Sequence, residues 1–206
     1  MESNSVIRQG GTMHKIRRED LLSLEEYAKR RNIFRDEVLV HKKHRQVHLG
    51  DHITLYFEDR LTIQYQVQEM LRTERIFEME GIADELAAYN PLIPDGCNLK
   101  ATMMIEYVDV DERRDALAKL IGVEDKIWLQ AAGQDKVFAM ADEDMERSNE
   151  EKTSAVHFLR FEFTSTMVQR LKSGGVLAAG VDHPECRIAV AALPKETHAS
   201  LIADFD

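Results

Sequence analysis

The chain has 206 residues, of which 44% are hydrophobic and 31% are charged, a balance typical of a soluble globular protein. Its formal net charge of -10 argues against a general nucleic-acid binder, because phosphate contacts require a basic field over the binding face. No apolar run approaches the length of a membrane span, and the N-terminus lacks the apolar core of a secretory signal. We therefore expect a cytoplasmic protein whose partners are neither membranes nor nucleic acids.

The N-terminal part is expected to be mainly helical. Glycines at positions 10 and 11 indicate a flexible tail over residues 1–15. Residues 20–45 then carry apolar side chains at a 3.6-residue spacing. Ser23 and Glu26 are placed for a capping box at the start of this helix, and a break is expected near Asn32.

A short β element is expected next, because the apolar period changes to two. Residues 46–58 alternate between apolar and polar or smaller side chains, and Gly50 with Asp51 supplies a turn between two strands. Residues 60–90 return to helical spacing, with an interruption expected at Gly81. The two prolines and the glycine of NPLIPDG, residues 90–96, end this helical region.

The C-terminal half shows one order of elements twice. The first unit has a strand at 99–108, a helix at 111–122 and a hairpin at 126–141. The second has a strand at 155–163, a helix at 164–175 and a hairpin at 176–193, and a last short helix follows Pro194. Each of the two internal helices ends at glycine, as a helix C-cap does. The shared order predicts an internal repeat of two β-α-β-β units.

Together these elements predict an α+β fold, in which a helical N-terminal part with a short β element precedes two β-α-β-β units. The two units are expected to form a mostly antiparallel sheet system. We expect residues 16–206 to form a single compact domain, mainly helical over 16–95 and duplicated over 96–206, with a homodimer as one arrangement of the chain.

Four stretches of the chain, FEDRLTIQYQVQEMLRTERI, ELAAYNPLIP, ATMMIEY and GVDHPE, resemble a bacterial family of unknown function. The resemblance runs from about Glu19 to the C-terminus. It implies a place in redox or oxidative-stress metabolism, because genes of that family often lie beside genes for rubrerythrin-like di-iron proteins and iron-sulfur oxidoreductases. It carries no catalytic residue over to this chain.

Positive charge is concentrated in one N-terminal segment. Residues 27–48 contain seven lysines or arginines against two acids, so this segment carries +5 and the remainder of the chain carries -15. A basic arm on an acidic body suits a protein partner with an acidic surface. The predicted partner-binding residues are Lys29, Arg30, Arg31, Arg35, Lys42, Lys43 and Arg45.

Four of the eight histidines fall within residues 41–52, at positions His41, His44, His48 and His52. On a continuous helix the first three would share one face, and neutral imidazoles at such spacing bind zinc or iron. Neighbouring lysines and an arginine oppose a cation, and the change of period divides the four between a helix end and a strand. An exposed basic segment with pH-dependent charge is therefore the favoured interpretation, and a metal site is the minority hypothesis.

Carboxylates and arginines alternate along residues 58–78. Such alternation is typical of a solvated helix face. The alternative is a ligand-binding cleft formed by Arg60, Gln66, Glu69 and Arg72. Di-iron sites in helix bundles use Glu-x-x-His pairs, and the chain has none, so we do not expect it to be a di-iron protein itself.

The two cysteines, Cys97 and Cys186, form no CxxC pair, and a reducing compartment is the default for such a chain. Asp95 and Glu185 stand near them and raise thiol pKa, so we expect structural rather than oxidant-sensing thiols.

The sequence favours a non-catalytic accessory or interaction protein without a cofactor, acting beside redox or iron proteins. It contains no Gly-x-Ser-x-Gly, Gly-x-Gly-x-x-Gly or Walker pattern to support a reaction. The alternative is a metal-binding sensor or enzyme that uses zinc or iron at His41 to His52. A nucleic-acid binder using the basic arm is a third class, and it predicts an affinity that falls steeply with salt.

Overall fold

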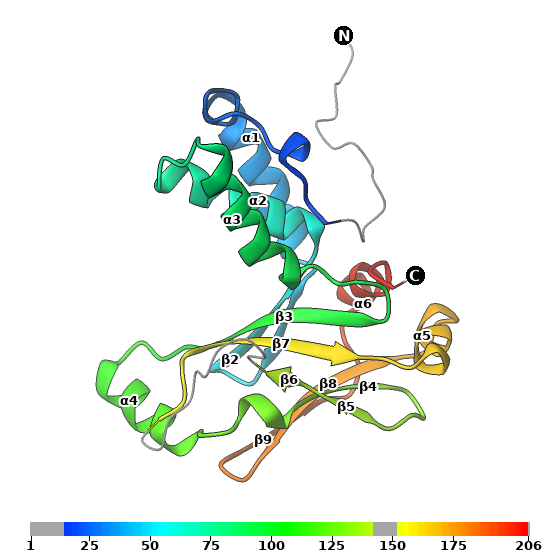
Figure 1. The fold of residues 1–206 in the computed structure, drawn as a ribbon. Coiled ribbons are helices and arrows are strands. Elements are labelled where there is room, and N and C mark those ends of the chain that lie inside the picture. The colour runs from blue at the N-terminus through cyan, green and yellow to red at the C-terminus, as the bar shows by residue number, and fades with distance from the viewer. Residues whose placement is uncertain (1–14, 142–151, 206) are drawn as a thin grey trace.

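The computed structural model describes residues 15–141 and 152–205 of the chain. An arm of three helices projects from a body that contains two antiparallel sheets (Figure 1). Residues 1–14, which make up most of the predicted tail, lie outside the described part. None of the helices in the described ranges is both long and apolar enough to span a membrane.

The arm consists of α1 (Leu24–Lys42), α2 (Arg60–Thr73) and α3 (Met79–Tyr89), with short 3-10 turns η1 (Arg18–Asp20) and η2 (Asn90–Leu92) at its edges. The Ser23 hydroxyl caps α1 by accepting a hydrogen bond from the Glu26 backbone N–H at 3.2 Å, which is one half of the predicted capping box. The predicted break near Asn32 is wrong, because α1 is continuous. Its buried face, including Phe34 and Val38, packs against Leu61 and Tyr65 of α2.

The helical region after the first hairpin breaks earlier than predicted. Arg75 adopts a φ of 56° just beyond α2, and this left-handed residue separates α2 from α3. The predicted interruption at Gly81 is wrong, since Gly81 lies inside α3. A Cβ at Gly81 would come within 2.8 Å of the Ile76 side chain, so the glycine lets the connection pack closely against α3.

Two sheets form the body of the molecule. The five-stranded sheet has the order β1-β2-β3-β7-β6, and the four-stranded sheet has the order β5-β4-β8-β9. All pairings within the two sheets are antiparallel. The strands are β1 (Gln46–Leu49), β2 (Ile53–Glu58), β3 (Asn98–Ile105), β4 (Ile127–Ala131), β5 (Lys136–Phe138), β6 (Met140–Ala141), β7 (Val156–Glu162), β8 (Leu177–His183) and β9 (Cys186–Val190).

The α+β fold is confirmed, and the β-α-β-β order occurs twice. The helices that complete the two units are α4 (Val110–Lys119) and α5 (Ser165–Lys172). Corresponding strands of the two units pair with each other, β3 with β7 and β4 with β8. The first unit departs from the predicted simple hairpin, because β5 joins the four-stranded sheet whereas β6 crosses to the five-stranded sheet.

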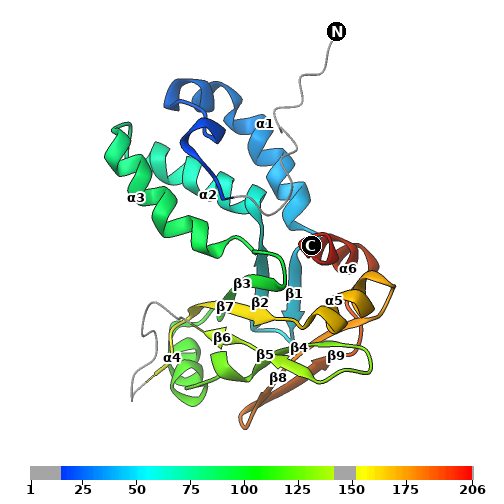
Figure 2. The same ribbon diagram turned by 45° about the vertical axis from the view of Figure 1, so that its right-hand side comes forward.

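Buried side chains form one core between the sheets and separate clusters in the arm. The body core includes Leu55, Leu99, Leu129 and Val181, each fully or almost fully buried. Ile63, Val67 and Leu71 of α2 instead contact Ile82 and Leu86 of α3. The last helix, α6 (Lys195–Ile202), lies beside the base of the arm (Figure 2). The predicted division of the domain near residue 95, into a mainly helical part and a duplicated part, stays a prediction.

Candidate functional site

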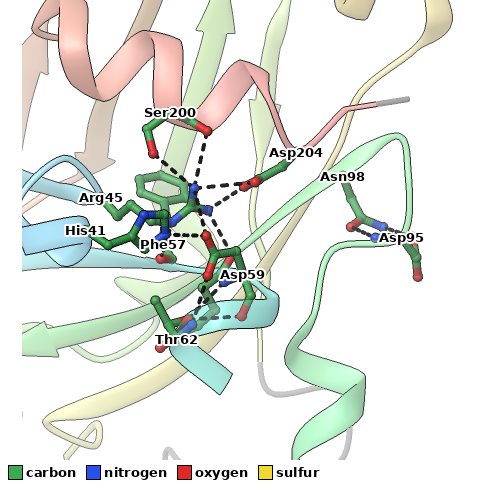
Figure 3. Close-up of polar contacts among 10 residues, drawn as sticks. His41, Arg45, Phe57, Asp59, Thr62, Asp95, Asn98, Ser200 and Asp204 are labelled. Carbon is green, nitrogen blue, oxygen red and sulfur yellow. Dashed lines mark hydrogen bonds and ion pairs between the residues drawn. The ribbon is translucent and has the colours of Figure 1, made fainter. Parts of the chain in front are cut away.

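Arg45, the last basic residue of the predicted docking segment, is buried at the base of the arm. Its side chain is 2% exposed, and its guanidinium forms ion pairs with Asp59 and Asp204 (Figure 3). The same guanidinium donates hydrogen bonds to the backbone carbonyls of Phe57 and Ser200, at 3.0 and 3.2 Å. We call His41, Arg45, Asp59 and Asp204 the Arg45 cluster.

Three separate parts of the chain supply the cluster. Asp59 is the N-cap of α2, where its side chain accepts from the Thr62 backbone N–H at 2.9 Å. His41 comes from the last turn of α1, and its Nε2 lies 2.5 Å from an Asp59 carboxylate oxygen. Asp204 follows α6 at the end of the described chain. The cluster therefore ties the arm to the sheet and to the C-terminal helix.

The pKa values of the two carboxyl groups in the cluster are shifted in opposite directions. Burial acts to raise the pKa of Asp59, but the His41 hydrogen bond and the Arg45 charge prevail and lower it to about 2. Burial raises the pKa of Asp204 to about 6, despite the attraction of Arg45, and the Asp59 charge adds to this rise. Ion pairs link the four side chains, so loss of one partner would leave a buried charge uncompensated.

Other predicted docking residues divide between the two sides of α1. Arg31 faces α2 and forms an ion pair with Glu69 at 2.7 Å, with its side chain half-buried, whereas Arg45 is fully buried. Lys42 is half-buried. The exposed residues of the predicted set are Lys29, Arg30, Arg35 and Lys43.

The solvent side of α1 also exposes apolar side chains. Ile33 is 66% exposed and Val40 is 58% exposed, and the two lie seven residues apart on one helical face. Lys29 and Arg30 precede Ile33 by about one turn, and Lys43 follows Val40 by about one turn. We call Lys29, Arg30, Ile33, Val40 and Lys43 the α1 outer surface. Exposed acids at positions 36 and 37 lie between its ends, so its positive charge is concentrated at those two ends.

The structure separates Arg60 from the other residues of the predicted ligand cleft. Arg60 lies in the first turn of α2 and Arg72 in the last, about 18 Å apart along the helix axis. Arg60 instead binds Asp20 at 2.8 Å. Glu69 accepts hydrogen bonds from Arg31 and Tyr27, and the Arg31 bond lowers the Glu69 pKa to about 2. Gln66 is half-buried on the same helix. Glu69 also pairs with Arg72 at 3.6 Å, so these two of the four residues are in contact, and a ligand-binding role for the set stays a prediction.

The predicted metal ligands are also dispersed. His41 binds Asp59, His48 contacts the Thr54 hydroxyl at 3.1 Å, and His52 contacts the Glu106 carbonyl at 2.9 Å. His44 lies in the turn after α1. Within residues 15–141 and 152–205, no group of three or more His, Cys, Asp or Glu side chains is placed to hold a metal ion. The four histidines therefore do not form one metal centre.

The two thiols lie in different surroundings. Burial raises the pKa of Cys186, which lies at the start of β9, whereas Cys97 is exposed before β3. Cys186 borders a cavity of about 730 Å³ between α4, the β1–β2 turn and the β8–β9 turn. The expected weak activation of Cys186 agrees with this placement, but its cause is burial rather than the neighbouring Glu185.

A second cavity, of about 410 Å³, lies on the face of the five-stranded sheet that points away from the body core. Its floor includes Glu58, Lys100 and Arg160, which are neighbours across β2, β3 and β7. Residues 90–94, around η2, border it from the arm side. We call it the sheet-face cavity. Its volume lies within the range of small-molecule sites.

Sequence reasoning missed several of these residues. Asp59 had a local signal, since Asp59 and Thr62 have the spacing of a helix-capping box. Asp204 had none, because it lies 159 residues from Arg45 in the chain. Lys100 and Arg160 alternate with buried residues in strands, but only the pairing of β3 with β7 shows that they are neighbours.

The fold and these contacts define an α+β protein with a helical arm fixed to a two-sheet body by a buried ion-pair cluster. Residues 15–205 match the family described as "Protein of unknown function (DUF3501)", and the chain belongs to this family. A crystal structure of a novel protein of unknown function from Burkholderia pseudomallei K96243 is similar at 50% sequence identity, with a TM-score of 0.89. The similarity covers 94% of this chain and 100% of that one. A search of curated proteins found no match.

Proposed function

We propose that this protein is an accessory protein that docks a partner with an acidic surface on the α1 outer surface. The observation that carries the proposal is the uncovered face of α1, on which Ile33 and Val40 are more than half exposed between basic ends. Apolar side chains supply buried contact area in an interface, and flanking charges guide the encounter and fix its register.

The class of partner follows from the family resemblance. The gene neighbours that the resemblance implies encode rubrerythrin-like di-iron proteins and iron-sulfur oxidoreductases. Those proteins from the same host are the first partners to test. The protein would then act in redox or oxidative-stress metabolism by positioning such a partner rather than by a reaction of its own.

The test is isothermal titration calorimetry of each purified partner against the full chain. The triple variant Lys29→Glu/Arg30→Glu/Lys43→Glu should bind at least about tenfold more weakly than the unmodified chain, because like charges would then face the acidic partner. Added salt should weaken the unmodified complex, since exposed charges are screened.

A matched control reverses three exposed lysines far from α1 in the sequence, Lys126→Glu/Lys172→Glu/Lys195→Glu, which makes the same change in net charge. This control variant should retain the affinity of the unmodified chain. Equal weakening in both variants would attribute the effect to net charge and reject the α1 outer surface. Absence of binding by every partner of both classes would reject the redox assignment.

A further inference from the structure

Strand β9 ends the four-stranded sheet, and no strand of residues 15–141 and 152–205 pairs with its outer side. It is the longest of the strands that end the two sheets, with five residues against four in β1, three in β5 and two in β6. Its register with β8 is continuous, and it contains no proline or glycine. Proteins protect exposed edges with short strands, prolines, bulges or charges, and β9 carries a single charge, at Arg187. The edge is therefore open to a further strand.

The register of β8 with β9 decides which backbone groups face this open side. The two strands are joined by a two-residue turn, residues 184–185, so His183 and Cys186 form a hydrogen-bonded pair. Hydrogen-bonded and non-hydrogen-bonded pairs alternate along an antiparallel ladder. The backbone N–H and C=O groups of Arg187 and Ala189 therefore point away from β8 and toward the open side.

The side chains of β9 alternate between two environments. Cys186, Ile188 and Val190 are half-buried and pack against the body core, whereas Arg187 and Ala189 are exposed on the other face. The three half-buried side chains are apolar, and they keep part of their surface in contact with water. A further strand beside β9 would cover that surface, which is favourable in proportion to the apolar area removed from water.

We propose that β9 pairs in antiparallel orientation with β9 of a second copy of the chain, about a two-fold axis that passes through Ile188. The two four-stranded sheets then form one continuous sheet. This register pairs all of β9, and it places the outward backbone groups of Arg187 opposite those of Ala189, so that each such pair exchanges two hydrogen bonds. On the core side Ile188 meets its equivalent and Cys186 meets Val190, which are apolar cross-strand pairs.

A second copy fits this edge because the pairing is self-complementary, as a two-fold interface requires. An axis through Arg187 would place two like charges directly opposite each other, which is destabilising. An axis through Ala189 would pair Cys186 with a residue beyond the end of β9. The axis through Ile188 avoids both, and Asp182, opposite Arg187 on β8, offsets the charge of that arginine.

The dimer is independent of the docking proposal, because it uses no residue of α1. Strand β9 lies on the side of the body that points away from the arm (Figure 1). Pairing of one five-residue strand gives a small interface, at the low end of those found between proteins. We therefore expect a dimer that dissociates on dilution.

The test is sedimentation velocity of the full chain at concentrations from about 1 to about 200 μM, over which a weak dimer should form. Ala189→Pro removes an outward N–H and leaves the bonds to β8 intact, so it should weaken dimerisation at least about tenfold. Ala189→Ser keeps the N–H and should dimerise as the unmodified chain does. A monomer at every concentration, which would leave the edge to a strand of another protein, would overturn the proposal. Equal dimerisation of Ala189→Pro would overturn it as well.

Disulfide cross-linking tests the position of the axis. In a chain with Cys97→Ser and Cys186→Ser, Ile188→Cys places the two new thiols directly opposite each other, and mild oxidation should link the copies. Val190→Cys is the matched control, because its two Cα atoms would lie more than about 13 Å apart, beyond the reach of a disulfide.

No covalent dimer in the Ile188→Cys variant, or equal cross-linking in the Val190→Cys control, would overturn the proposed register. Melting curves show whether each variant is folded. The cysteine variants decide the matter if Ala189→Pro is not folded.

Discussion

The two sides of α1 place basic residues in different environments. On the inner side Arg31, and just beyond the helix Arg45, meet carboxylates at close range; Arg45 is buried and Arg31 is half-buried. On the outer side Arg30 and Lys43 are exposed. The comparison shows that a basic stretch in a sequence is not one surface, because helical periodicity divides it between the fold and the solvent.

Removing Arg45 should have the largest effect on stability. Arg45→Met leaves Asp59 and Asp204 buried without their shared guanidinium, and should lower the free energy of unfolding by about 3–5 kcal/mol. Chemical denaturation of the variant checks this, with Arg113→Met, an exposed residue on α4, as the control. A loss no greater than that of the control would show that the fold does not depend on Arg45 to compensate the buried carboxylates of Asp59 and Asp204.

The Asp204 carboxyl should give the cluster a pH dependence of intermediate size. The folded state retains the Asp204 proton up to about pH 6, whereas the unfolded state releases it near 3.8, so the folded state binds more protons between these values. Stability from this group is therefore greatest below that window and falls as the pH rises through it.

Asp204→Asn should remove this decline. The unfolding free energy of the unmodified chain, relative to that of the variant, should fall by about 1–3 kcal/mol between pH 4 and pH 7. Denaturation curves at several pH values measure the difference. Asp59, whose pKa is lowered to about 2, acts in a separate window, because its contribution is present above 3.8 and is lost as the pH falls toward 2. Parallel pH profiles for the two proteins would contradict the assignment to Asp204.

The ion pair between α1 and α2 should contribute less. Glu69→Gln weakens the contacts with Arg31 and Tyr27 and should cost about 1–2 kcal/mol at neutral pH. The Glu69 contribution is present above 4.5 and is lost as the pH falls toward about 2, so the cost should shrink in acid. Unfolding at pH 7 and pH 3 measures both values. A cost that is equal at the two would argue for packing rather than charge.

The smallest effect on stability is expected on the outer side. Arg30→Glu/Lys43→Glu changes exposed side chains for which the described chain shows no ion pair, and should shift the unfolding free energy by less than about 0.5 kcal/mol. Thermal and chemical denaturation test this directly. A larger loss would mean that these residues also support the fold and that the two sides of α1 do not differ as proposed.

Local patterns predicted most of the elements. The change to a period of two revealed β1 and β2, and the capping serine marked the start of α1. The break between α2 and α3 was predicted at Gly81, because glycine often interrupts helices. It lies instead at Arg75, which adopts a left-handed conformation that arginine rarely takes, so the sequence gives no sign of it. The sequence also supplied no means of seeing that β5 and β6 belong to different sheets.

The candidate sites were less predictable than the elements, because they depend on tertiary pairing. Helical spacing alone could place Arg31 and Arg30 on different sides, but it could not show which side would be covered. The partner of Arg45 lies at the far end of the chain, and the charged floor of the sheet-face cavity exists only because β3 lies between β2 and β7. Residues that are distant in sequence acquire their roles from the topology of the fold.

The most direct test of the division of α1 is the affinity of a purified acidic redox partner for two variants measured side by side. Arg30→Glu/Lys43→Glu should lose at least about tenfold in affinity while keeping its stability, whereas Arg31→Gln should bind as the unmodified chain does while unfolding more easily. The reverse pattern, with affinity lost in Arg31→Gln and retained in the outer double variant, would contradict the account.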